Sequence, residues 1–146
     1  GSGSVVRGDH TPIATGLFVP TGLASTESDL WVADWASGFV FQIVDDGIPV
    51  FIPVASGLVQ PEGMTVNTDG SLLVVETGAG RLTRIDLDTN EVTVIVEGLE
   101  IGSPGPPGYP PTWSFSGVAV SPSGHIFVTA EGSNLLYRFK QYPRHR

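Results

Sequence analysis

Acidic side chains are the most numerous groups in this sequence that could bind a ligand or take part in a reaction. The 146-residue chain has 15 Asp and Glu against 7 Lys and Arg, and its formal net charge is −8. This balance is compatible with cation binding, although solubility is the commoner reason for an acidic surface. It argues against a nucleic-acid partner, because phosphates require a basic surface.

Other residue types that carry chemistry form no recognisable motif. His10, His125 and His145 lie far apart in the chain, without the spacing of metal ligands. The chain has no cysteine, no glycine-rich phosphate loop and no nucleophile elbow, so the sequence identifies no catalytic residue. No segment approaches the length of an apolar membrane span, and we predict no membrane partner.

The elements that would position these side chains are short strands in a module that occurs three times. The passages "LWVADWASG", "LLVVETGAG" and "IFVTAEGSN" begin at Leu30, Leu72 and Ile126. Each passage ends in a turn residue at the corresponding position, which is Gly38, Gly80 or Asn134. A glycine also precedes each passage by eight or nine residues, at Gly22, Gly63 and Gly117. Self-similarity of this kind is typical of repeat architectures.

Each module alternates apolar and polar residues between turn signals, which favours antiparallel strands. Two modules have four such strands, which is the pattern of a propeller blade, so the sequence predicts an all-β fold. The expected strands cover residues 11–16, 22–25, 30–34, 38–44, 49–55, 63–66, 71–76, 80–86, 91–97, 117–120, 125–129 and 134–140. The apolar blade faces are expected to include Leu30, Val32, Val40, Leu72, Val74, Leu82, Ile126, Val128 and Leu136.

The repeated passages resemble blades of the NHL-repeat β-propellers and their relatives. The resemblance is carried by "VPTGLASTESDLWVADWASG", "QPEGMTVNTDGSLLVVETGAGRLTRIDL" and "SGVAVSPSGHIFVTAEGSNLLYRF", and it covers roughly residues 13–140. The relatives include gluconolactonase-type lactonases, strictosidine-synthase-like proteins, virginiamycin B lyase and the scytonemin-cluster propellers. The resemblance is specific for the fold and weak for any one activity, since this architecture supports many functions.

The resemblance also implies candidate metal ligands. In the lactonase-like relatives a divalent cation lies on the propeller axis, held by Glu, Asn and Asp side chains. Glu62 in "PEGM" matches the Glu and Asp34 in "WVAD" matches the Asp, with Glu76 as a third candidate. Thr21 stands where Asn is expected, and Ala130 removes one acid. The cofactor implied is Ca²⁺ or another divalent cation; alternatively, these acids end strands and cap turns.

Further residues are candidates for lining the central channel, where a small-molecule ligand could bind. Thr21 and Ser116 occupy the same slot as Glu62 in their modules, and Glu131 follows a strand end. Trp35 and Trp113 fall at loop positions, whereas Trp31 lies within a strand and is expected in the core.

The domain organisation predicts half of a six-bladed ring. Residues 1–4, "GSGS", read as a cloning remnant, and no signal peptide opens the sequence, so the compartment is unknown. An outer strand at 11–16 precedes blade one (17–56), blade two (57–98) and blade three (114–140). Blade three lacks a fourth strand, so a two-fold homodimer is expected to supply it from the partner's N-terminus. The alternative is a truncated fragment.

Two functions follow from these observations. The first is an assembly or binding scaffold that closes a six-bladed propeller as a homodimer. The second is a metal-dependent lactonase- or lyase-like enzyme, for which two-fold symmetry would double the carboxylates on the axis. A proline- and glycine-rich insertion at 98–113 interrupts the repeat and is expected either to cover the channel or to act as a passive connector.

Overall fold

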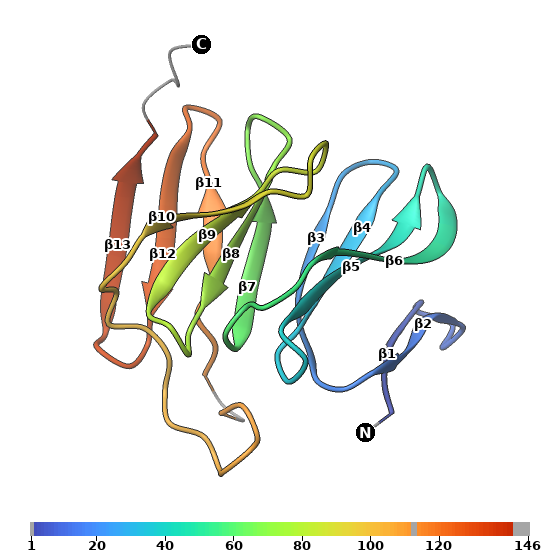
Figure 1. The fold of residues 1–146 in the computed structure, drawn as a ribbon, viewed down its shortest axis with the longest axis horizontal. Helices are drawn as coiled ribbons and strands as arrows, with labels where there is room; N and C mark the ends of the chain where they lie inside the picture. Colours follow the sequence, from blue (N-terminus) through green and yellow to red (C-terminus); the bar gives the residue numbers. More distant parts are fainter. Residues whose placement is uncertain (1, 112–113, 142–146) are drawn as a thin grey trace.

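The structure, a computed structural model, describes residues 2–111 and 114–141 and consists of antiparallel sheets arranged side by side (Figure 1). None of these residues lies in a helix long and apolar enough to cross a membrane. The strands are β1 (Gly3–Val6), β2 (Pro12–Leu17), β3 (Pro20–Ser25), β4 (Leu30–Asp34), β5 (Phe39–Asp45), β6 (Ile48–Ala55), β7 (Pro61–Val66), β8 (Leu72–Glu76), β9 (Arg81–Ile85), β10 (Val92–Val96), β11 (Val118–Val120), β12 (His125–Ala130) and β13 (Leu135–Lys140).

Three sheets correspond to the three predicted blades. Strands β3 to β6 form blade one and β7 to β10 form blade two, and each strand pairs with the next in chain order. Strands β11 to β13 form a three-stranded blade three. Neighbouring strands of each blade are antiparallel, which confirms the predicted all-β fold of propeller blades.

The tight turns have the residues that their backbone conformations require. Asp45 pairs with Ile48, so a two-residue loop joins β5 to β6. The loop residues Asp46 and Gly47 both have positive φ, at 46° and 76°. Positive φ at both central positions is the property of a type I′ turn, for which Asp-Gly is a preferred sequence.

The N-terminal segment differs from the prediction of a single strand at 11–16. Strand β2 lies there, but β1 pairs with it and includes Gly3 and Ser4, which were interpreted as part of a cloning remnant. Val5 of β1 packs with Ile13 against the face of blade one. Two register irregularities occur within these four residues. The pairing was missed because a short Gly- and Ser-rich segment has almost no strand pattern until a neighbouring sheet supports it.

The hydrophobic core lies between the blades. One cluster joins Val40 of blade one to Leu72 and Val74 of blade two, and a second joins Leu82 to Ile126 and Val128 of blade three. Val32 packs instead against the β1–β2 hairpin, with Leu30 partly buried beside it. These predicted core positions are confirmed.

Leu136 is the exception, since 64% of its side chain is exposed. The prediction that this residue is buried is wrong for the single chain. Its side of blade three has no further blade against it, whereas the corresponding sides of blades one and two are covered.

The recurrent glycines permit close approach of the innermost strands. A Cβ atom on Gly22 would collide with the backbone of Glu62, and one on Gly63 would collide with the backbone of Ser116 and Gly117. Glycine is therefore required at these two positions by the packing of one blade on the next. At Gly117 a Cβ would meet only the Thr129 hydroxyl, at 3.3 Å.

Candidate functional site

The slot that contains Glu62 connects the innermost strands of blades one and two to the next blade. In blade one, the Thr21 hydroxyl donates to the carbonyl oxygen of Pro61 at 2.8 Å. In blade two, Glu62 Oε2 accepts the backbone N–H of Ser116 at 2.7 Å. Both side chains therefore connect their own blade to the next one. Thr21 does so as the hydrogen-bond donor and Glu62 as the acceptor.

Glu62 is a carboxylate held in a nearly water-free position. It is 2% exposed, and its Oε1 accepts the Thr77 hydroxyl at 3.2 Å. Burial, and to a smaller extent the charge of Glu131, raise the pKa of Glu62 against the opposing effect of its hydrogen bonds from Ser116 and Thr77. A buried carboxyl with a raised pKa is a recognised mark of functional sites.

Asp34 holds the chain where it enters blade one. Its two carboxylate oxygens accept the backbone N–H groups of Phe18 and Val19, each at 2.8 Å, and it is 1% exposed. The side chain thus links the end of β4 to the segment between β2 and β3.

Glu76 makes the equivalent link in blade two, between the end of β8 and the segment that leads into β7. It is fully buried and accepts the Val59 N–H at 2.7 Å, two hydrogen bonds from Arg81 at 2.9 Å, and the Thr83 hydroxyl. Desolvation alone would raise the pKa of Glu76, but Arg81, Thr83 and Val59 together lower it.

Blade three has no carboxylate at the position equivalent to Asp34 and Glu76. Ala130 occupies the strand-end position, and the next residue, Glu131, accepts the Ser116 hydroxyl at 2.8 Å through Oε2. Glu131 Oε1 is buried and has no hydrogen-bond partner among the described residues. Ser116 therefore joins two carboxylates, since its N–H bonds Glu62 and its hydroxyl bonds Glu131.

The three predicted metal ligands do not converge within one chain. Across residues 2–111 and 114–141, no group of three His, Cys, Asp or Glu side chains could hold a metal ion. Asp34 and Glu76 direct their oxygens to backbone groups of their own connections. The repeat identified equivalent slots, but the direction of a carboxylate depends on the donors that tertiary packing brings to it.

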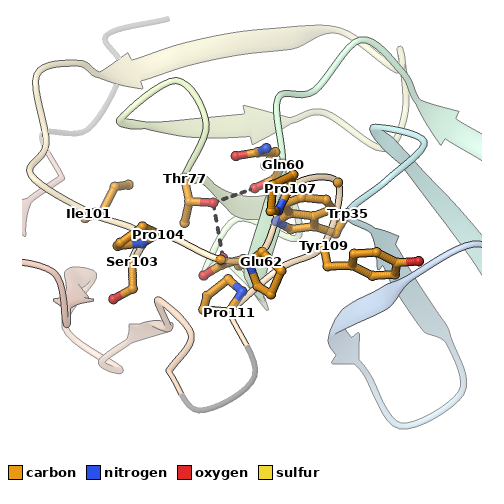
Figure 2. Close-up of a pocket in the computed structure, with 14 residues that line it drawn as sticks. Trp35, Gln60, Glu62, Thr77, Ile101, Ser103, Pro104, Pro107, Tyr109 and Pro111 are labelled. Atoms are coloured by element: carbon orange, nitrogen blue, oxygen red, sulfur yellow. Dashed lines mark hydrogen bonds between the residues drawn. The ribbon is translucent and has the colours of Figure 1, made fainter.

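A cavity of about 390 Å³ lies above Glu62, beneath the insertion (Figure 2). Its wall includes the predicted residue Trp35 and also Gln60 and Thr77, which sequence reasoning missed. The remaining lining residues are Ile101, Gly102, Ser103, Pro104, Gly105, Pro106, Pro107, Gly108, Tyr109 and Pro111. The insertion thus forms most of the wall of a cavity beside the innermost strands.

The other predicted lining residues have different positions. Ser116 and Glu131 lie behind Glu62, as a hydrogen-bonded pair that is not part of the cavity wall. Thr21 lines a second cavity of about 280 Å³ between β1 and β3, together with Leu23. Trp113 lies outside the described residues.

The base of the insertion is anchored in the core. Leu99 and Ile101 are each 8% exposed and pack against blade three. Glu100 donates its N–H to the Tyr137 hydroxyl at 3.1 Å, and Gly102 donates to Ser116 Oγ at 3.3 Å. The insertion is therefore fixed where it meets the cavity, while Tyr109, further along it, is 66% exposed.

Comparison with known proteins supports the fold. No family model matches the chain, and no curated protein matches it. A gluconolactonase from Xanthomonas campestris superposes with a TM-score of 0.59 at 20% identity, over 82% of this chain and 37% of that one. Virginiamycin B lyase from Staphylococcus aureus has a TM-score of 0.57 at 13% identity, over 95% and 48%.

A third structure, an auxiliary nutrient binding protein from Bacteroides thetaiotaomicron, has a TM-score of 0.68 at 15% identity, over 92% of this chain and 31% of that one. The chain thus spans less than half the length of each of these proteins. Its fold is that of the β-propellers related to gluconolactonase and virginiamycin B lyase, as the repeated passages predicted.

Proposed function

We propose that this chain is a propeller module that assembles with a second copy of itself into a closed six-bladed ring and serves as a binding scaffold. Propellers close with four to eight blades, so three blades form an arc with two open sides. A two-fold axis that relates two arcs closes both sides with one kind of contact.

The exposed face of blade three carries this proposal. In blade two, Leu73, Val75 and Leu82 pack against blade three. The pairing registers place Phe127, Thr129 and Leu136 at the corresponding positions of blade three. Leu136 is 64% exposed, and Thr129, which pairs with it, is exposed as well. A face that repeats an established interface between blades is suited to bind another blade.

The opposite side of the arc has room for innermost strands. The β1–β2 hairpin covers Leu30, Val32 and Ile43, which is the outer part of that face of blade one. The 280 Å³ cavity lies further in, between β1 and β3, and Leu23 beside it is 51% exposed. Strands of a neighbouring blade would fill this space.

Strand β1 adds a requirement to the closure. In the proposed ring, β2 is the outer strand of a partner's blade three and pairs with the partner's β13. Strand β1 pairs with β2 in the single chain, so it has to separate from β2 before that pairing forms. Strand β1 is suited to leave, because it has four residues, an irregular register and a Val6 side chain that is 46% exposed.

Light scattering coupled to size exclusion tests the assembly. We expect the mass of two chains, with dissociation on dilution. A well-folded monomer at micromolar concentration would contradict the proposal, and a trimer would require nine blades and a different closure.

The alternative is a lactonase- or lyase-like enzyme, favoured by the buried carboxylate of Glu62 beside a cavity. Hard cations take six or more oxygen ligands. The residues of one chain do not fit such an ion, because Asp34 and Glu76 are committed to other partners. Ligands from a second chain would be needed. Titration with calcium or zinc while the melting temperature is followed tests this alternative, and no shift at millimolar metal would exclude it.

A further inference from the structure

Glu62 in the cavity floor and Glu131 behind it share Ser116, and no cationic side chain among the described residues pairs with either. Glu62 and Glu131 both accept hydrogen bonds from Ser116. The ion pairs within residues 2–111 and 114–141 are made by Arg81 and Arg84, and none involves either of these glutamates. Carboxylates removed from water are normally paired with an opposite charge. Negative charge at the cavity floor therefore favours a positively charged ligand.

The wall formed by the insertion offers hydrogen-bond acceptors, donors and apolar surface. Pro104, Pro106, Pro107 and Pro111 contribute carbonyl oxygens and ring methylenes, whereas Ser103, Gly105 and Gly108 also carry donors. Such a wall suits a ligand that has both polar groups and apolar surface.

Aromatic side chains lie on the side of the cavity opposite Ile101 and Ser103. Figure 2 shows Trp35 and Tyr109 there, at the edge of the space above Glu62. The faces of indole and phenol rings attract organic cations.

We propose that the cavity beneath the insertion binds a small organic ammonium ion with an apolar or aromatic body, with Glu62 as its counter-ion. The volume of about 390 Å³ is within the range of small-molecule sites. No group of three His, Cys, Asp or Glu side chains among the described residues could hold a metal ion, which distinguishes this ligand from a bare divalent cation. The site lies within one chain and does not depend on the proposed dimer.

Isothermal titration calorimetry with tyramine and tyrosol tests this proposal. The two compounds share a phenol ring and a two-carbon arm, and they differ in a terminal ammonium or hydroxyl. We expect tyramine to bind at least about tenfold more tightly than tyrosol, since only the ammonium forms a charge-assisted bond with Glu62. Glu62→Gln should remove this preference, because Gln keeps an acceptor for the Ser116 N–H but has no charge. Glu91→Gln, at an exposed turn, is the matched control and should retain it.

A pH series on the unaltered chain provides a second measurement if Glu62→Gln does not fold. Tyramine affinity should fall as the pH is lowered through the pKa of Glu62, while tyrosol affinity stays constant. Glu131 is the other carboxyl group that accepts a hydrogen bond from Ser116. Equal affinity for the two compounds, no tyramine binding at millimolar concentration, or calcium binding without tyramine binding would each overturn the proposal.

Discussion

At the scale of single residues, the strand-end carboxylates determine how each blade begins. Asp34 and Glu76 occupy equivalent positions and accept backbone N–H groups of the segment that leads into their own blade. A carboxylate that bonds buried donors compensates for the loss of their hydration. The sequence identified these residues correctly as repeated acids, but their oxygens stabilise the fold.

Glu76→Gln is expected to lower the free energy of unfolding by about 3 kcal/mol, because it leaves Arg81 without its buried partner. The pKa of Glu76 is below its ordinary value of 4.5 in the folded chain. The ionised carboxylate of Glu76 therefore contributes its full stabilisation at pH values above 4.5. This stabilisation is lost as the pH falls through the lowered pKa of Glu76 in the folded chain. Urea denaturation across this acid range should show a smaller decrease in the free energy of unfolding for Glu76→Gln than for the unaltered chain. Parallel curves for the two proteins would contradict the prediction.

Gly63→Ala is expected to destabilise the chain by about 1–3 kcal/mol, since the added Cβ would overlap the backbone of Ser116 and Gly117. Gly117→Ala is the matched variant. Its Cβ would meet only the Thr129 hydroxyl, so folding of the single chain should change little.

The same Gly117→Ala variant should weaken the dimer if a partner blade approaches β11 as closely as blade three approaches β7. Thermal unfolding measures the first effect, and light scattering measures the second. A Gly117→Ala chain that dimerises normally would show that the open face is not used as proposed.

At the scale of elements, the sheets are stable because each blade buries the face of its neighbour. Val74 of β8 is fully buried in the cluster between blades one and two. Val74→Asp should abolish folding, because burying an unpaired charge costs more than about 4 kcal/mol, a large part of the stability of a domain. Val94→Asp in β10, where the side chain is 37% exposed, is the control and should leave a folded protein by circular dichroism. A folded Val74→Asp chain would show that the strand register is wrong.

Most strands could be predicted because their signal is local. Residues 30–34 were expected as a strand and form β4, and 125–129 form most of β12. Turn residues and alternating apolar residues act over short distances and determine these limits. Strand β1 has no comparable signal, since it exists only through pairing with β2 and packing on blade one.

At the scale of the whole molecule, the N-terminal hairpin is the part of the chain on which the proposed closure depends. Deleting residues 1–16 removes β1 and nearly all of β2, so it should yield aggregate or a monomer of low stability. Deleting residues 1–7 removes only β1 and should leave the dimer intact, because β2 remains available for the partner's β13. Light scattering distinguishes these results. Loss of the dimer in the shorter deletion would mean that β1 is itself part of the interface.

The sequence by itself determined the repeat, the antiparallel sheets and most of the core, because these depend on periodicity and turn residues within short segments. It also named Glu62 and Trp35 as candidate site residues, and both line the cavity. Only the tertiary structure decided that Asp34 and Glu76 bond backbone groups, that Glu62 and Glu131 share Ser116, and that the insertion covers a cavity. The physical reason is that the direction of a side chain and its charge balance depend on donors and walls brought from distant parts of the chain.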